Sequence, residues 1–210
     1  MLKLLEKEFK LNIHWLFPVA TILFALLIFI PEWVYSIAFF YLYWICIPNI
    51  YSAYNAQKDF TFTQMLPVSK GQIVQSKIAA IVLLQALQLA ACAIVAAARN
   101  TLYGQENFAL DLTPAFFGLM LVIYGGFNLI FFPGYFKTAY HYGKPFLFGL
   151  IFATLAAAAA ETANALSPAF KNFMEGGGAL GQWAALLAGL AAFAALTYLA
   201  VRASIKRFGA

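Results

Sequence analysis

The sequence predicts an all-α integral membrane protein with six transmembrane helices in a single domain, residues 1–210. Apolar residues make up 64% of the chain and charged residues only 10%, whereas soluble domains carry about 25% charged residues. The apolar residues form runs of about 20 positions, the length that an α-helix needs to cross a bilayer. The short alternating segments that are typical of a transmembrane barrel are not visible.

Residues 1–13 are expected to form an amphipathic helix. Leu5 and Phe9 recur at helical spacing, while most of the charged side chains, among them the Glu6 and Lys10 pair, lie on the other face. Such a helix either lies flat on the membrane surface or simply extends the first span into the cytoplasm, and the sequence leaves both open. The apolar run that follows has no small-residue cleavage site, so we expect it to remain as an uncleaved first span.

The spans are placed on the apolar runs in chain order. We expect them at residues 14–31, 33–54, 78–98, 114–136, 146–163 and 181–202. A very short turn at Pro31-Glu32 joins the first two. None of the loops between the spans is long enough to form a nucleotide-binding domain.

The basic residues predict the orientation of these spans. With six spans, both termini and the loops at 55–77 and 137–145 lie on one side, opposite Arg99 and Lys171. That side carries all the other basic residues: Lys3, Lys7, Lys10, Lys58, Lys70, Lys77, Lys137, Lys144, Arg202, Lys206 and Arg207. Because Lys and Arg gather in cytoplasmic loops, both termini are expected in the cytoplasm. We assign the net charge of +5 to this bias and not to nucleic-acid binding.

The cytoplasmic loop at 55–77 is expected to contain two helical segments separated by a break. Pro67 disfavours helical geometry in the preceding residue and so ends the first segment. Ser69 can cap the second helix, with Gln72 completing a capping box and Val68 and Ile73 forming a hydrophobic staple.

The first segment of this loop, from about Asp59, is expected to expose four apolar side chains to the cytoplasm: Phe60, Phe62, Met65 and Leu66. Apolar residues at a water-facing position usually mark a contact surface. The same side chains can also fold back into the headgroup region. The residues alone leave a protein contact and a membrane contact open.

Several polar residues fall inside the expected spans: Asn49, Gln85, Gln88, Asn128 and Glu161. Polar groups in a membrane seek hydrogen-bond partners, so these side chains are expected to face protein or a cavity. Two interpretations remain, because such residues either hold helices together or line a substrate path. Glu161 is ionisable, which favours a functional role if it lies at membrane depth, but it sits near the outer end of its span.

Motifs of enzymes and of resident cofactors are absent or misplaced. Glycines within 176–181 match GxGxxG spacing but follow no strand, and no GxxxxGK[ST] motif occurs, so any ATP must be bound elsewhere. His14 and His141 have no acid or cysteine at ligand spacing, and we expect no metal site. Cys46 and Cys92 lie in apolar runs without CxxC spacing, so no disulfide is inferred.

The loop also carries a family resemblance. Leu66-Pro67-Val68-Ser69-Lys70, followed by Ile73-Val74 and Lys77, resembles the Leu-Pro-Val-Ser-Arg/Lys…Ile-Val…Lys signature between spans two and three of ABC-2-type permeases. These are the membrane subunits of ATP-binding-cassette exporters, and Asp59 fits the upstream acid of the pattern. Phe136-Lys137 and Tyr142-Gly143-Lys144 resemble a loop of the compact branch, which includes permeases of phenol-soluble-modulin and other peptide exporters.

The resemblance implies an ABC-2, type V exporter-like permease subunit without enzymatic activity of its own, in the cytoplasmic membrane of a bacterium. It would export an amphipathic or hydrophobic substrate such as a peptide. A second permease subunit, identical or related, would complete the path, and a cytoplasmic ABC ATPase would bind ATP and Mg.

The resemblance also implies that the loop forms a coupling helix docked on the ATPase. The coupling residues would be Asp59, Phe60, Phe62, Met65, Leu66, Pro67, Val68, Ser69, Lys70, Gln72 and Ile73. Two alternatives stay open. One is an ATP-independent secondary transporter, although neither a mid-span acid nor a convincing repeat favours it. The other is a non-transporting assembly or immunity factor.

Overall fold

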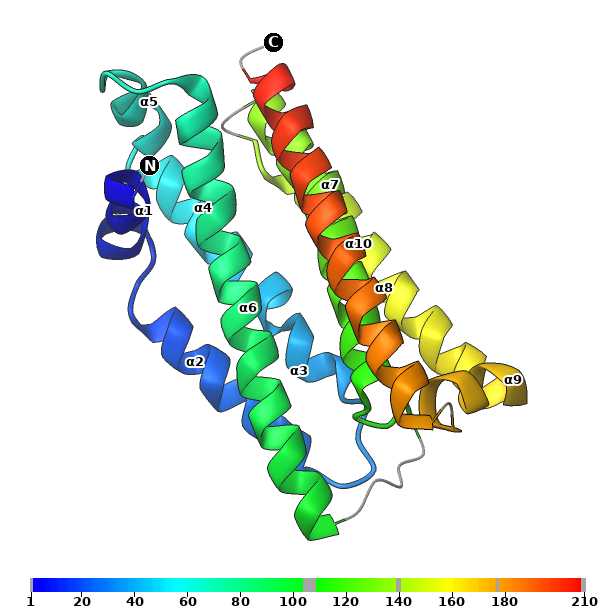
Figure 1. Ribbon diagram of the computed structural model, residues 1–210. Coiled ribbons are helices and arrows are strands. Elements are labelled where there is room, and N and C mark those ends of the chain that lie inside the picture. The colour runs from blue at the N-terminus through cyan, green and yellow to red at the C-terminus, as the bar shows by residue number, and fades with distance from the viewer. Residues whose placement is uncertain (1, 104–108, 139–140, 177, 209–210) are drawn as a thin grey trace.

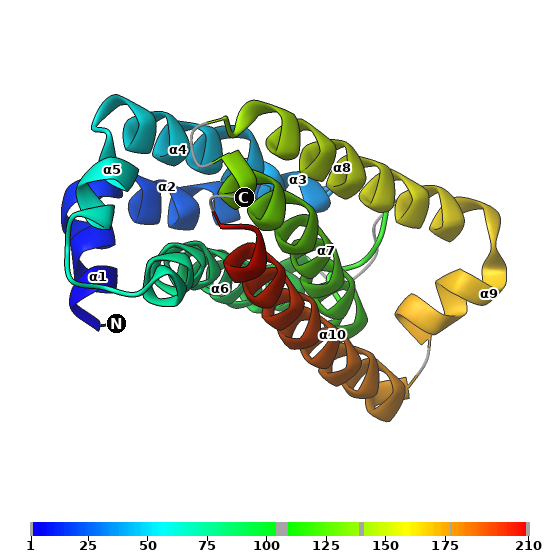
Figure 2. The ribbon, with the colours of Figure 1, turned by 90° about the horizontal axis from the view of Figure 1, so that it is seen from above.

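The computed structural model describes residues 2–103, 109–138, 141–176 and 178–208, and all regular structure within these ranges is helical. The helices form an elongated bundle with both ends of the chain at the same end of the molecule (Figure 1). Seen from above, the N-terminal elements and α5 lie beside α6, on the opposite side of the bundle from α8 and α9 (Figure 2).

Five helical segments are long and apolar enough to cross a membrane: Ser36–Ala56, Lys70–Tyr103, Pro114–Thr138, Gly143–Leu166 and Gly178–Arg207. The last four are α6, α7, α8 and α10. The first is a run of α3 (Ser36–Tyr41), η3 (Leu42–Cys46) and α4 (Ile47–Ala56), in which η3 is π-helical. The all-helical membrane fold is therefore confirmed.

The N-terminal region forms a sharply bent pair of helical segments. α1 (Leu2–Lys7) and η1 (Glu8–Asn12) meet α2 (Leu16–Ala25) and η2 (Leu26–Phe29) at an angle of 81°. The second segment alone is shorter than the roughly 20 residues of a span. The structure thus has five candidate spans, or up to six if the bent pair counts as one. The sixth span and the amphipathic role of the N-terminal helix stay predictions.

The predicted two-residue turn at Pro31-Glu32 is wrong. Residues 30–35 are not helical. The reason is local, because a proline disfavours helical geometry in the residue before it, and Ile30 is extended, with φ −70° and ψ 119°. Glu32 then takes a φ of +50°, which reverses the chain toward α3.

α7 and α10 cross at very close range through two glycines. A Cβ added to Gly189 would lie 2.3 Å from the carbonyl oxygen of Gly118, and one added to Gly118 would lie 2.6 Å from that of Ala185. Any larger residue at either position would collide with backbone. Small residues allow such close approach between membrane helices, and α10 follows α7 over most of its length (Figure 1).

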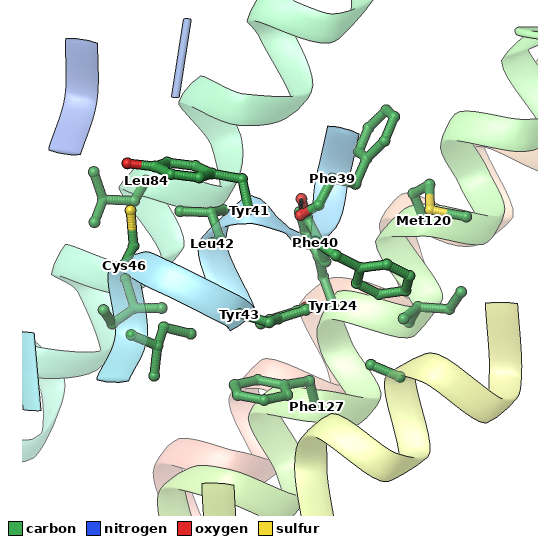
Figure 3. Close-up of a cluster of buried hydrophobic side chains, with 14 of the residues drawn as sticks. Phe39, Phe40, Tyr41, Leu42, Tyr43, Cys46, Leu84, Met120, Tyr124 and Phe127 are labelled. Atoms are coloured by element: carbon green, nitrogen blue, oxygen red, sulfur yellow. Dashed lines mark hydrogen bonds between the residues drawn. The ribbon is translucent and has the colours of Figure 1, made fainter. Parts of the chain in front are cut away.

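Aromatic side chains from α3, η3 and α7 fill the centre of the bundle (Figure 3). The Tyr43 ring stacks on Phe127 at 4.1 Å between centroids and meets Tyr124 edge-on at 5.4 Å. The Tyr124 hydroxyl donates to the Phe39 carbonyl at 3.0 Å. These contacts fix the second predicted span against α7. Cys46, at the end of η3, is buried here as a free thiol.

The connection between α8 and α10 contains two short helical segments, α9 (Pro168–Lys171) and η4 (Asn172–Gly176). The Thr113 hydroxyl donates to the Met174 carbonyl at 2.9 Å, which ties this connection to the start of α7. Gly177 of the GxGxxG spacing lies outside the described residues, as do residues 104–108 of the loop between α6 and α7.

Candidate functional site

The loop between α4 and α6 folds as a short helix, a break and a capped helix start. α5 (Asp59–Gln64) begins after Lys58, whose φ of +50° turns the chain, and α6 begins at Lys70. The Ser69 backbone N–H donates to Gln72 Oε1 at 3.0 Å, and the Gln72 backbone N–H donates to Ser69 Oγ at 3.3 Å. The predicted capping box is therefore present.

The outer face of α5 and the turn after it expose apolar side chains. Phe62 is 55% exposed and Met65 is 77% exposed, while Leu66 is half-buried. Beside them, an open groove of about 610 Å³ lies between this loop and the N-terminal helix. The groove is lined by Lys3, Leu4, Lys7, Leu11, Phe62, Leu66, Pro67, Val68 and Gln72.

Phe60 does not belong to this exposed surface, and the prediction that it does is wrong. It is 5% exposed, and its ring lies 5.0 Å from that of Phe208 just after α10. In a helix, positions three or four apart share a face, so Phe60 lies with buried Thr63 on the inner face of α5. No pattern in the sequence indicated that Phe208 would pack there.

Four charged side chains lie beneath α5 and form what we call the ion cluster: Glu8, Asp59 and Lys77, which are buried, and Lys7, which is 11% exposed. Asp59 accepts from Lys7 Nζ at 2.7 Å through Oδ1 and from Lys77 Nζ at 2.5 Å through Oδ2. Glu8 Oε1 lies 3.3 Å from Lys77 Nζ and 3.5 Å from Lys7 Nζ. Lys77 is fully buried and Glu8 is 1% exposed. The cluster joins the N-terminal segment, α5 and α6.

Neutral side chains make further hydrogen bonds and contacts with the charged groups of the ion cluster. Asn12 Nδ2 donates to Glu8 Oε2 at 2.8 Å and to Asp59 Oδ1 at 3.2 Å. Thr63 Oγ1 accepts from Lys7 Nζ at 2.8 Å, and Lys77 Nζ lies 3.5 Å from the centroid of the Tyr54 ring. With two cations, two anions and these partners, the buried charges are paired and hydrogen-bonded, which burial of charge requires.

Burial by itself would raise the pKa of Asp59, but the charge of Lys77 and the hydrogen bonds from Lys7 and Lys77 outweigh it and hold that pKa below its ordinary value. Asp59 is therefore an anion at neutral pH. As a result, α5 cannot move away from α6 without separating Asp59 from Lys77 in a dry environment.

Sequence reasoning linked Asp59 with Lys77 only through the family signature, and it connected neither of them with Lys7 or Glu8. No spacing rule connects residues that lie 52 or 69 positions apart in the chain. The one available signal was the presence of charged residues of both signs in a chain with few charges.

A second buried polar group, which we call the amide network, lies deeper in the bundle. Gln85 Nε2 donates to Asn128 Oδ1 at 2.9 Å, and Asn128 Nδ2 donates back to Gln85 Oε1 at 3.0 Å and to Thr197 Oγ1 at 3.3 Å. It links α6, α7 and α10. Gln88, also buried, donates to the Ala38 carbonyl at 2.9 Å. These contacts match the interpretation of the amides as links between helices.

The other two predicted path residues lie apart from the amide network. Asn49 is exposed and donates to the Ile45 carbonyl of its own helix at 2.7 Å. Glu161 Oε2 accepts from the Leu110 backbone N–H at 3.0 Å and so holds the loop before α7 against α8. The five residues thus do not converge on one cavity, and a substrate path along them stays a prediction.

Comparison with known proteins finds a family match for the chain. A protein-family model described as ABC-2 family transporter protein matches residues 3–208. No curated protein and no solved structure matches the chain.

Proposed function

Because the chain belongs to the ABC-2 transporter family, we propose that it is the permease subunit of an ATP-driven exporter. The family is one of membrane transport components, and the helices are those of a multi-pass membrane protein. A separate cytoplasmic ABC ATPase would bind ATP and Mg and supply the energy. This chain would carry no covalent chemistry.

One observation carries the proposal. α5 and the turn after it expose Phe62 and Met65 on one side, and the buried pairing of Asp59 with Lys77 fixes α5 to α6 on the other. An exposed apolar patch of this kind is typical of a protein contact. The patch is the part of the loop that would dock on the ATPase, and the ion cluster is the part that would hold it to the membrane helices.

The mechanism follows from these connections. ATP binding would draw the two ATPase subunits together and displace α5. Because Lys77 lies in α6, the same displacement would act on a single helix that runs unbroken from Lys70 to Tyr103. The amide network would pass the motion to α7 and α10. The ATPase must contact the two permease states differently, since only differential contact shifts their populations.

The substrate would be amphipathic or hydrophobic, with a peptide as the first candidate. The spans are apolar and aromatic, and none of the described residues offers a charged path through them. A second permease subunit, identical or related, would complete the path. α8 and α10 favour this arrangement, because only 22% and 11% of their most apolar windows are buried within the chain, against 67% for α7.

The test is recovery of partners from the native host in mild detergent, followed by mass spectrometry. We expect the tagged wild-type chain to retain a P-loop ATPase in stoichiometric amount. The double variant Phe62→Asp, Met65→Asp should still insert but lose that partner, because it removes the two exposed apolar side chains that would form the contact. Gln64→Asp is the matched control, since it adds a charge to the exposed side of α5 without removing an apolar contact.

Two outcomes would overturn the proposal. Reproducible recovery of the folded wild-type chain alone would contradict an ATPase partner. Retention of the ATPase by the double variant would place the docking surface elsewhere. Phe60→Asp is not used, because that side chain is buried against Phe208 and its replacement would disturb the fold.

A further inference from the structure

α6 and α10 lie side by side toward the end that holds both termini (Figures 1 and 2). Two hollows lie between these helices, and α7 also lines the outer one. The inner hollow, about 300 Å³, lies toward the end that holds both termini and is lined by Gln75, Ile78, Ala79, Val82, Tyr198 and Val201, among others. The outer hollow, about 500 Å³, is lined by residues such as Leu89, Ala93, Asn100, Phe117 and Trp183.

The two hollows differ at their rims. At the inner hollow, the Arg202 guanidinium lies 5.2 Å from the centroid of the Tyr198 ring. The Tyr198 ring therefore lines the hollow and also makes a cation–π contact with Arg202. Arg202 is exposed, and the ion pairs among the described residues do not include it. Every described residue lining the outer hollow is uncharged.

Arg202 also lies at the depth where headgroups are expected. It is the last residue of the predicted span at 181–202, and Lys206 and Arg207 follow it on the same helix. Gln75 lies at the matching level of α6, just before the predicted span at 78–98. The wall below them is made of aliphatic side chains, namely Ile78, Ala79, Val82 and Val201.

We propose that the inner hollow binds an anionic phospholipid, with an acyl chain against Ala79 and Val82 and the phosphate on Arg202. Basic pockets between transmembrane helices bind anionic headgroups, and a guanidinium matches phosphate geometry through two parallel hydrogen bonds. A soluble phosphate would leave the apolar wall bare. The site does not depend on export, so it stands or falls separately from the proposed function.

The test uses the full chain, purified in mild detergent and stripped of lipid. Phosphatidylglycerol and phosphatidylcholine with the same acyl chains are titrated, and bound lipid is counted by native mass spectrometry. We expect the wild type to prefer phosphatidylglycerol. Arg202→Gln should weaken phosphatidylglycerol binding about fivefold, which corresponds to the roughly 1 kcal/mol that one basic residue contributes at an anionic membrane surface. Phosphatidylcholine binding should fall less, because its choline cation balances the charge of its phosphate.

Arg207→Gln is the matched control, because it removes the same charge from the same end of α10 but does not touch the hollow. It should keep the wild-type preference. Val82→Trp should fill the hollow and remove the bound lipid while Arg202 remains. Melting temperatures of all variants identify any that fail to fold, and Arg202→Lys then serves as the milder variant.

Three results would overturn the proposal: equal binding of both lipids by the wild type, equal losses in Arg202→Gln and Arg207→Gln, or displacement of bound phosphatidylglycerol by inorganic phosphate. The second would reduce the effect to general surface charge. The third would mean that the apolar wall contributes nothing.

Discussion

The ion cluster and the amide network are both buried on α6, with Lys77 and Gln85 only eight residues apart, or about 12 Å along the helix. They differ in what they join. The ion cluster holds short elements outside the long spans, α5 and the N-terminal segment, whereas the amide network joins α6 to α7 and α10. They also differ in charge, because the first pairs ions and the second pairs neutral amides.

This difference follows from the length of the elements that are joined. α5 has six residues, and a helix that short is not stable by itself in water. It needs strong contacts to keep its place, and Asp59 and Lys77 provide them. α7 and α10 are long, satisfy their own backbone hydrogen bonds and pack through glycine. The amides there add only a specific link. We therefore expect the two groups to respond very differently to substitution.

The largest effect is expected from Lys77→Met. Removing one partner of a buried ion pair leaves an uncompensated charge, which destabilises a protein by about 3–5 kcal/mol. Asp59 and Glu8 would then share only Lys7, and α5 should detach from α6. Thermal unfolding in detergent, followed by tryptophan fluorescence, measures the loss, and proteolysis at residues 59–69 locates it.

A second substitution sharpens this result. Adding Glu8→Gln to Lys77→Met removes one negative charge and makes the ion cluster neutral again, so the double variant should be more stable than Lys77→Met alone. Its change in the free energy of unfolding should therefore differ from the sum of the changes in the two single variants. Lys10→Ala breaks the exposed pair with Glu6 and should change nothing measurable. Equal losses from Lys77→Met and Lys10→Ala would contradict the buried ion cluster.

A smaller effect is expected from Asn128→Leu in the amide network. Hydrogen bonds between membrane helices contribute about 0.6 kcal/mol on average and rarely more than 1.7, and Leu keeps the branched shape of Asn without its hydrogen-bonding groups. Gln85 would lose its reciprocal partner, so we expect a loss of about 1 kcal/mol in the same unfolding assay. Val122→Leu on the exposed side of α7 is the control. A loss as large as that of Lys77→Met would erase the distinction between the two groups.

Local chemistry made part of this molecule predictable from sequence. The start of α6 at Lys70, the capping box and the break at Pro67 follow from residues within a few positions of one another. Five of the six expected spans have candidate helices because a bilayer demands long apolar runs. The reciprocal pairing of Gln85 with Asn128 fits the expectation that buried amides find partners, although the partner itself was not predicted.

Contacts between distant segments were not predictable. Phe60 is buried because Phe208, near the other end of the chain, packs on it. Glu8 joins Lys77 only because the N-terminal segment bends by 81° and returns to α6. The turn at Pro31 was misjudged for a different reason, since the extended geometry that it imposes on Ile30 lengthens the connection. In the first two cases the periodicity of one segment carries no information on which distant segment packs against it.

The ion cluster and the amide network should also differ in how their local stability responds to pH. The pKa of Asp59 is held below its ordinary value of 3.8 by Lys77 and Lys7 against the opposing effect of burial. A carboxyl with a lowered pKa in the folded state contributes stability that is fully present above 3.8 and is lost as the pH falls through the folded-state pKa. Hydrogen exchange, corrected for intrinsic rates, should therefore show residues 59–64 losing protection below pH 3.8 while residues 125–129 around Asn128 keep theirs.

The variant Asp59→Asn decides whether this loss belongs to the ion cluster. It cannot titrate at this position, so its α5 should begin with weaker protection and change less with pH than the wild type. The amide network contains no group that titrates in this range, so its protection should stay flat in both proteins. Parallel loss of protection in both regions of the wild type would show that acid loosens the whole bundle. The ion cluster would then not be a separate anchor for α5.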